Sequence, residues 1–203
     1  ADAVELNIYR IATNPDTTSA EIEGQTIDTV REVRHLVTIP VAVKLSPFYA
    51  ALANLARELD RAGADGLVLF NRFYQPDIDP HELAATRTLH LSDSSELRLR
   101  LHWMAILSGH VKASLAVTGG VHTALDVVKA TMAGAHVTQM VSALLVHGPG
   151  HLRTVLGDLM AWLHEREWES LGAMRGNLNL SRVPDPDAYE RANYMLMLQG
   201  WRP

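Results

Sequence analysis

Five short apolar runs recur along the chain, each bounded by glycine, proline or polar residues. They cover residues 4–8, 41–45, 66–70, 114–118 and 137–141. A run of this length, rich in Val, Leu and Ile, is typical of a strand in a parallel sheet that is covered on both sides. We therefore expect five parallel strands, each buried on both faces.

Amphipathic segments of helical length separate these runs. They cover residues 21–37, 50–62, 95–107, 123–133 and 151–168, and their apolar residues recur about every three to four positions. The alternation of strand and helix predicts an α/β fold. Residues 61–70 and 132–141 repeat one join, in which a helix passes through Ala-Gly-Ala into a strand. We expect Gly63 and Gly134 to end their helices in the left-handed conformation that glycine tolerates.

Two topologies fit this alternation, a (β/α)8 TIM barrel and a doubly wound sheet. A barrel needs eight strands and about 250 residues, more than this chain of 203 residues offers, whereas a doubly wound domain needs no further strand. Polar residues stand at the carboxyl ends of nearly every predicted strand. Barrel active sites are built from the carboxyl ends of several strands, whereas a doubly wound sheet binds its ligand at one switch point, so this distribution favours the barrel. These strand-end residues are Asn7, Lys44, Asn71, Thr118, Gly119, Gly120 and Ser142.

The composition narrows the classes of partner. There are 18 basic and 23 acidic residues, a net charge of −5, whereas proteins that bind nucleic acid usually carry a basic surplus. No apolar run approaches the roughly 18 residues of a membrane helix, and no signal peptide is visible. We expect a cytoplasmic protein that takes a small-molecule substrate and binds neither nucleic acid nor membrane. Whether it forms a homo-oligomer is left open.

Metal and thiol chemistry are not expected. The chain has no cysteine, which excludes disulfides, thiolate metal sites and a cysteine nucleophile. The ten histidines look scattered, and Gly-Pro-Gly between His147 and His151 breaks the helix that would align that pair. We predict no metal site.

Gly119 and Gly120 stand between a predicted strand and a predicted helix. Backbone N–H groups at such a join, at the positive end of the helix dipole, can hold a phosphate. Ser142 ends the next strand and could face the same phosphate, as in the paired loops of barrel phosphate sites. The alternative is a tight turn with no ligand. If the phosphate is there, we expect a Cβ at Gly120 to intrude where the backbone meets it.

Lys44 and two asparagines are the other unusual residues at strand ends. A lysine in a buried strand is costly to desolvate, so Lys44 is either functional or extends its ammonium to water. Asn7 and Asn71 are either turn residues or amides that recognise a polar heterocycle.

Taken in order, short motifs across most of the chain resemble the dihydroorotate dehydrogenase-like FMN flavoproteins. The motifs are Glu-Leu-Asn at 5–7, Pro-Val-Ala-Val-Lys-Leu at 40–45, Gly-Ala-Asp-Gly at 63–66 through Asn71, Thr-Gly-Gly-Val at 118–121 and Ser-Ala-Leu at 142–144. The resemblance implies that the five strands are strands four to eight of a (β/α)8 barrel. The first three β/α units would then be absent, carried by about 100 upstream residues. Residues 1–180 would form the barrel part, and residues 181–203 a tail packed on the barrel or a neighbour.

The resemblance also implies a function. Family members of this kind would bind FMN and oxidise or reduce a CH–CH bond of a small polar or anionic, dihydroorotate-like substrate, in pyrimidine biosynthesis. By the family pattern Asn7 and Lys44 contact the flavin ring, and Asn71 holds the substrate. Gly119, Gly120 and Ser142 take the FMN phosphate.

Departures from the family pattern concentrate at the positions that the family uses for its substrate. The family stretch after Glu-Leu-Asn carries a Ser or Cys base, whereas residues 8–12 here place Arg10 at that position and leave Tyr9 as the candidate base. Arg10 and Arg72 suit an anionic substrate group. We therefore expect poor turnover of dihydroorotate itself. Two alternatives stay open: a phosphate-binding lyase or isomerase without flavin, and a degenerate flavin-barrel domain without turnover.

Overall fold

Five parallel strands form the central sheet of the computed structural model, which describes residues 1–73, 75–190 and 198–200. They are β1 (Val4–Asn7), β2 (Val41–Leu45), β3 (Gly66–Leu69), β6 (Ser114–Thr118) and β7 (Val137–Gln139), in the order β1-β2-β3-β6-β7. The spatial order follows the chain without a reversal, whereas a doubly wound sheet has a switch point where the order reverses. The α/β fold with a parallel sheet is confirmed, and the observed strand order is consistent with a TIM barrel.

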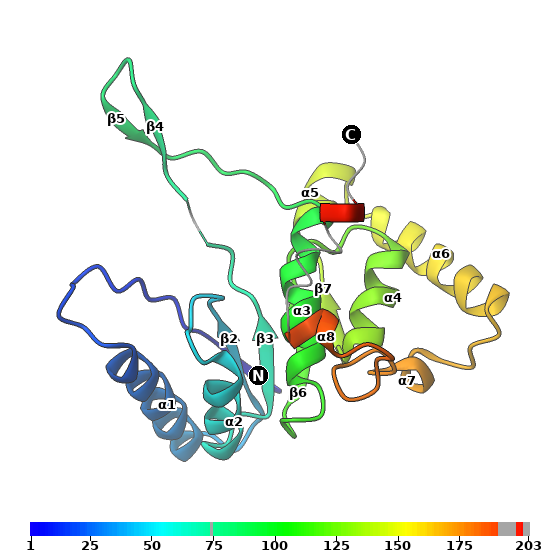
Figure 1. The fold of residues 1–203 in the computed structure, drawn as a ribbon, viewed down its shortest axis with the longest axis horizontal. Helices are drawn as coiled ribbons and strands as arrows, with labels where there is room; N and C mark the ends of the chain where they lie inside the picture. Colours follow the sequence, from blue (N-terminus) through cyan, green and yellow to red (C-terminus); the bar gives the residue numbers. More distant parts are fainter. Residues whose placement is uncertain (74, 191–197, 201–203) are drawn as a thin grey trace.

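Helices connect consecutive strands, and further helices follow β7. They are α1 (Ser19–Leu36), α2 (Leu52–Arg61), α3 (Leu97–Leu107, after the 3-10 turn Ser94–Glu96), α4 (Ala124–Ala133), α5 (Ser142–His147), α6 (His151–Glu165), α7 (Leu171–Met174) and α8 (Asp187–Glu190). Contacts run from α1 to α2, α3, α4 and α6 in turn, so these helices form one continuous layer beside the strands (Figure 1).

Local signals in the sequence fix where the helices begin and end. α1 starts at a capping box, in which the Glu21 backbone N–H donates to Thr18 and the Thr18 N–H donates to the Glu21 carboxylate. Gly63 and Gly134 lie at φ +100° and +129°, which confirms the predicted glycine joins. At Gly134 a Cβ would stand 2.3 Å from the Ser108 side chain, so the join also needs the missing side chain.

The helix layer covers only one face of the sheet. Along β2, Val41, Val43 and Leu45 are fully buried, whereas the intervening Ala42 and Lys44 are half-buried. The expectation of burial on both faces is therefore wrong for β2, although it holds for β3, where the consecutive residues Leu67, Val68 and Leu69 are all buried. We call the face covered by helices the covered face and the opposite one the open face.

The sheet is strongly curved toward its open face. β1 and β7 are its two edges, yet Gln139 Nε2 of β7 donates to Glu5 Oε2 of β1 over 3.4 Å. A flat sheet would hold these edges about 19 Å apart, because neighbouring strands lie about 4.8 Å apart. Two side chains cannot span that distance, so the open face is concave.

An antiparallel hairpin that the sequence analysis did not predict stands away from the rest of the chain (Figure 1). It pairs β4 (Asp77–Asp79) with β5 (Ala84–Thr86). Its turn is closed by Asp79, whose carboxylate accepts the N–H groups of His81 and Glu82. Ile78 and Leu83 are exposed on this arm.

The start of the predicted tail packs on α3 through α8. The Tyr189 hydroxyl donates to the carbonyl of Leu178 over 3.0 Å, and its ring lies beside His102. Residues 191–197 and 201–203 of the predicted tail lie outside the described residues.

Candidate functional site

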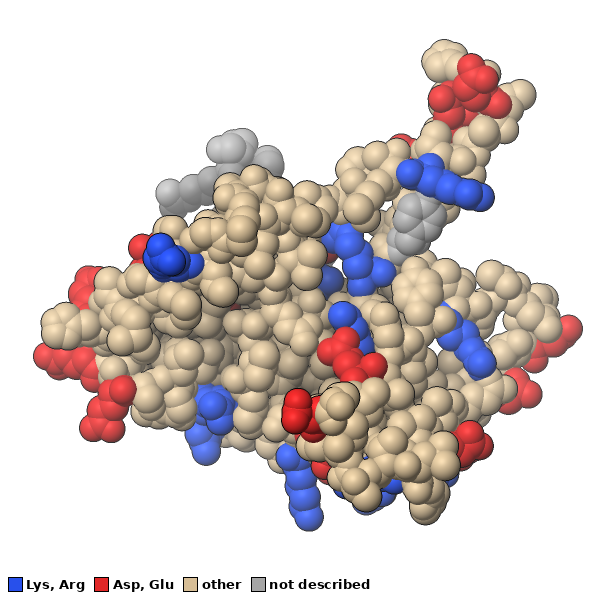
Figure 2. All heavy atoms as spheres, turned by 180° about the vertical axis from the view of Figure 1, so that it is seen from behind, with Lys and Arg blue, Asp and Glu red and all other residues tan. Residues whose placement is uncertain are grey.

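A pocket opens at the carboxyl ends of β2, β6 and β7, and we call it the strand-end pocket. Its volume is about 270 Å³. Three cationic side chains line it, from Lys44, Arg72 and Arg100, and the lining includes no acidic residue. Basic side chains also lie around the hollow at the base of the hairpin arm when the molecule is seen from behind (Figure 2). Apolar side chains make up much of the remaining lining, so the pocket could hold an anionic group at its cationic side chains beside an apolar one.

Ser92 joins the three loops that wall this pocket. Its backbone N–H donates to Ser142 Oγ over 3.1 Å, and its own Oγ accepts the N–H of Gly120 over 3.3 Å. Ser92 is buried, so these contacts hold the strand-end pocket together. Ser92 was not predicted from the sequence, because its partners lie 28 and 50 residues away and leave no local signal.

The glycine pair has a different steric role from the one predicted. Gly119 and Gly120 have φ of +84° and +81° and line the strand-end pocket together with Ser142. A Cβ on Gly120 would stand 2.5 Å from the backbone nitrogen of Leu97 in α3. The expectation that it would intrude on a phosphate is therefore wrong, since α3 fills that space.

Lys44 lies at the end of β2 on the open face and lines the strand-end pocket. Its ammonium is 3.5 Å from Glu5 Oε1, an ion pair that is partly exposed. Asn7 is paired in register with Lys44 at the end of β1 and is exposed. Glu5 contacts both Lys44 and Gln139, and it was not among the site residues predicted from the sequence.

Asn71 and Arg72 direct donors to their own chain. The buried amide of Asn71 donates to the carbonyls of Ile8 and Lys44, over 3.0 and 3.4 Å, and so ties the ends of β1 and β2 together. Arg72 Nη1 donates to both carboxylate oxygens of Glu96, and its Nη2 donates to the carbonyl of His90.

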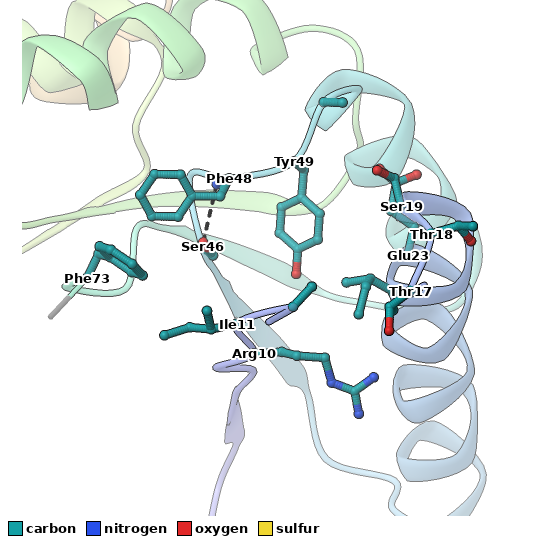
Figure 3. Close-up of a pocket in the computed structure, with 13 residues that line it drawn as sticks. Arg10, Ile11, Thr17, Thr18, Ser19, Glu23, Ser46, Phe48, Tyr49 and Phe73 are labelled. Carbon is teal, nitrogen blue, oxygen red and sulfur yellow. Dashed lines mark hydrogen bonds between the residues drawn. The ribbon is translucent and has the colours of Figure 1, made fainter. Parts of the chain in front are cut away.

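Arg10 lies in a second pocket of about 290 Å³, between the loops that follow β1 and β2, and we call it the Arg10 pocket (Figure 3). One wall is apolar, with Phe48 and Phe73 packed edge to face at 4.5 Å. Tyr49 also lines it, and burial is the main cause that raises the pKa of this phenol above its ordinary value of 10.0. Tyr49 is therefore a neutral hydrogen-bonding group at neutral pH.

The predicted catalytic and substrate residues are only partly brought together. Tyr9 is 50% exposed and is not part of the Arg10 pocket lining. Arg10 and Arg72 line different pockets. Segments 44–46 and 70–73 contribute to both pockets, so the two sites are neighbours at the ends of β2 and β3.

The histidines are packed more closely than their spacing suggested. The rings of His147 and His151 are 4.6 Å apart although Gly-Pro-Gly ends the helix between them, and His151 Nε2 contacts the carbonyl of His122. Among residues 1–73, 75–190 and 198–200, no group of three His, Asp or Glu side chains is placed to hold a metal ion.

Comparison with known proteins decides the family. The family model described as "Dihydroorotate dehydrogenase" matches residues 1–163, most of this chain. The chain belongs to the dihydroorotate dehydrogenase family. In the part of the chain that the structure describes, no helix is long and apolar enough to cross a membrane.

Three curated relatives bear the name dihydroorotate dehydrogenase B (NAD(+)), catalytic subunit. Those of Bacillus mycoides and Shouchella clausii are 28% and 29% identical to this chain, and that of Bacillus cereus strain AH187 is 27% identical. Each match covers 86% of this chain but only 57–58% of the relative. The chain thus spans a little over half the length of the curated relatives it matches.

Members of the dihydroorotate dehydrogenase family are flavoproteins, and the strand-end pocket fits the phosphate end of a flavin nucleotide. It offers three cations, a glycine turn at the end of β6 and the Ser142 side chain, with no lining carboxylate to repel a phosphate. Lys44 extends the same pocket onto the open face, where the ring system could lie.

Proposed function

We propose that this chain is the flavin-binding part of an FMN-dependent oxidoreductase that acts on a CH–CH bond of a small anionic, dihydroorotate-like substrate. The observation that carries the proposal is the strand-end pocket, which gathers cations and a glycine turn at the end of the sheet where barrel enzymes bind phosphate. Family membership and the names of the relatives support the reaction class.

We also propose that the five strands occupy positions four to eight of the family's barrel. Their sequential order, the single helix layer and the strong curvature all suit five-eighths of a barrel wall. Further β/α units would pair with the open edges of β1 and β7 and enclose the open face.

Within this proposal the predicted cofactor residues keep their tasks. Gly119, Gly120 and Ser142 would hold the FMN phosphate, and Asn7 and Lys44 would lie beside the flavin ring. Bound FMN would supply the acceptor for a hydride. The Lys44 ammonium would hold a positive charge next to the ring, with Glu5 fixing its position.

The substrate would lie in the neighbouring Arg10 pocket. Arg10 would bind an anionic group of the substrate through forked hydrogen bonds, and Phe48 and Phe73 would pack on a planar ring. Tyr9 stays the predicted base beside Arg10, but it is not part of this pocket's lining, so we expect poor turnover of dihydroorotate itself. Robust oxidation that persists in Tyr9→Phe would place the base elsewhere.

One observation favours the second candidate, a flavin-barrel domain without turnover. Asn71 and Arg72, the residues predicted to hold the substrate, direct side-chain donors to carbonyls and a carboxylate of the chain itself. Such a domain would bind FMN, but it would transfer no electrons from a dihydropyrimidine carboxylate to an electron acceptor.

Flavin binding is tested by titrating the full chain into FMN and following the quenching of flavin fluorescence. We expect saturable binding that Ser142→Ala weakens several-fold, since a charge-assisted hydrogen bond is lost. The control Thr154→Ala removes an exposed hydroxyl on α6 and should bind FMN as the natural chain does. Absence of saturable binding by the natural chain would contradict the proposal.

Lys44 is tested separately, by the reduction potential of the bound flavin. Lys44→Met removes a positive charge beside the ring and should lower that potential. An unchanged reduction potential in a flavin-loaded variant would mean that Lys44 has only a structural role in the sheet.

A further inference from the structure

Arg100 is a buried cation that no predicted role accounts for. It lies in α3, and its side chain is 8% exposed. Nε donates to the carbonyl of Thr118 over 3.1 Å, and Nη1 donates to the carbonyl of Glu96 over 2.7 Å. These two bonds fix the plane of the guanidinium at the end of β6.

The remaining nitrogen of Arg100 lies against the glycine turn. Nη2 is 2.9 Å from the position that a Cβ of Gly119 would take, so only glycine leaves room for the guanidinium there. Arg100 also lines the strand-end pocket. The orientation therefore brings a buried positive charge to the turn at which a phosphate is proposed to bind.

The charges around Arg100 do not balance. Glu96 is paired with Arg72 at 2.9 Å and lies 3.7 Å from Arg100 Nη1, so one carboxylate serves two guanidinium groups. Burial lowers the pKa of Arg100, and nearby Arg72 lowers it further, while Glu96 opposes both. A buried surplus of positive charge is costly unless an anion compensates it.

We propose that Arg100 recognises the phosphate monoester dianion in the strand-end pocket, and that Glu96 is the positioning residue that holds Arg100 and Arg72 against it. The inference rests on the proposed function where the phosphate is that of FMN. A phosphorylated substrate would present the same chemistry, so the experiment must separate the two sources.

Arg100 suits this role better than the other two cations of the pocket. Arg72 engages Nη1 and Nη2 with Glu96 and the His90 carbonyl. Lys44 faces Glu5 and lies toward the open face. A guanidinium fixed by two backbone carbonyls presents its outer N–H groups in one orientation, which matches the oxygens of a phosphate.

The test compares the affinity of the full chain for FMN with its affinity for riboflavin, which lacks the phosphate, by fluorescence quenching. In the natural chain FMN should bind more tightly. Arg100→Gln should reduce the FMN-to-riboflavin affinity ratio about 10- to 100-fold, the range expected for hydrogen bonds to a charged group, while riboflavin affinity stays unchanged. The control Arg98→Gln, an exposed residue of the same helix, should leave the ratio unchanged.

A merely structural role predicts a different result. If Arg100→Gln weakens FMN and riboflavin equally, or leaves the ratio unchanged, the proposal is overturned. Glu96→Gln should lower the ratio less than Arg100→Gln does, since both arginines remain; an unchanged ratio would remove the positioning role of Glu96. If Arg100→Gln does not fold, inorganic phosphate is added to the natural chain instead. It should then weaken the binding of FMN and leave the binding of riboflavin unchanged. If phosphate changes the binding of neither flavin, the proposal is overturned.

Failure of the proposed function gives its own outcome. If the natural chain binds neither flavin, calorimetric titration with inorganic phosphate and glycerol 3-phosphate takes the place of FMN. Binding of these ions that Arg100→Lys weakens and Arg98→Gln does not would support Arg100 as a phosphate residue for a phosphorylated substrate. Absence of phosphate binding would overturn both the proposed function and this inference.

Discussion

The two faces of the five-stranded sheet differ in what they bury and in what they carry. Leu45, Leu67 and Leu69 on the covered face are fully buried beneath the helices. The open face carries Glu5, partly exposed Lys44 and Gln139, and Val137 there is 53% exposed. Fully buried leucines characterise the covered face, whereas the open face carries the charged side chains beside buried Val68.

The difference shows that one strand can serve two purposes on alternate residues. Side chains alternate across a strand, so the residues that pack under helices and the residues that face the concave side are neighbours in sequence. Stability and ligand binding should therefore respond to different substitutions in the same strand.

The largest effect is expected in a test of the curvature itself. The chain has no cysteine, so Glu5→Cys with Gln139→Cys gives two unique thiols on β1 and β7. A short bis-maleimide reagent should join them within one chain in high yield, because these side chains meet across the open face. A control pair, Glu5→Cys with Lys129→Cys on the exposed side of α4, should not be joined. Failure of the first pair would mean that the sheet is flatter than described.

Truncating a side chain on each face compares their contributions to stability. Leu69→Ala on the covered face should lower the free energy of unfolding by about 2–5 kcal/mol, the usual cost of a cavity in a core. Val137→Ala on the open face should change it by less than about 0.5 kcal/mol. Urea denaturation of both variants measures the difference, and equal losses would contradict the assignment of the two faces.

The glycine turn at the rim of the open face offers a matched pair. Gly120 and Gly148 both have φ of +81°, but a Cβ would meet the Leu97 backbone at 2.5 Å in the first case and no atom within 4 Å in the second. Gly148→Ala should cost about 1–2 kcal/mol from the left-handed backbone alone. Gly120→Ala should cost about 1–3 kcal/mol more, because α3 must shift. Equal losses in urea denaturation would show that α3 can move without cost.

The smallest effect belongs to the exposed cap of α1. The Thr18 backbone N–H donates to Glu21 and lowers the pKa of this carboxyl below its ordinary value of 4.5. The stabilisation is therefore complete above that value and is lost as the pH falls through the lowered pKa. Glu21→Gln keeps the cap without the charge, so the natural chain should lose stability more steeply than the variant below pH 4.5. Glu32→Gln, an exposed residue of the same helix, should not change the slope; parallel curves for Glu21→Gln would contradict the prediction.

The sequence was sufficient to predict the strands but not which of their faces is covered. The predicted runs 41–45 and 114–118 coincide with β2 and β6, because Val and Leu runs between turn residues leave few alternatives. Alternation within β2, where Ala42 and Lys44 separate Val41, Val43 and Leu45, was the signal for a one-sided sheet. The run 137–141 was too long by two residues, since apolar Met140 and Val141 lead into α5.

The candidate site was predictable only where its residues stand at strand ends. Lys44, the glycine pair and Ser142 could be found from their positions in the pattern, and the structure places them in one pocket. Ser92 could not, because long-range contacts alone bring it to the pocket wall. Arg100 looks like one more basic residue of an amphipathic helix, and its burial against Gly119 follows from how α3 packs.

Backbone hydrogen exchange of the full chain, with and without FMN, tests most directly whether the rim of the open face is the binding site. FMN should slow exchange of the amides at 91–92, 118–121 and 141–143, which wall the strand-end pocket, and should leave the helical amides of α1 and α2 unchanged. Protection confined to residues 10–19 and 46–50 around the Arg10 pocket, or no protection at all, would contradict the account.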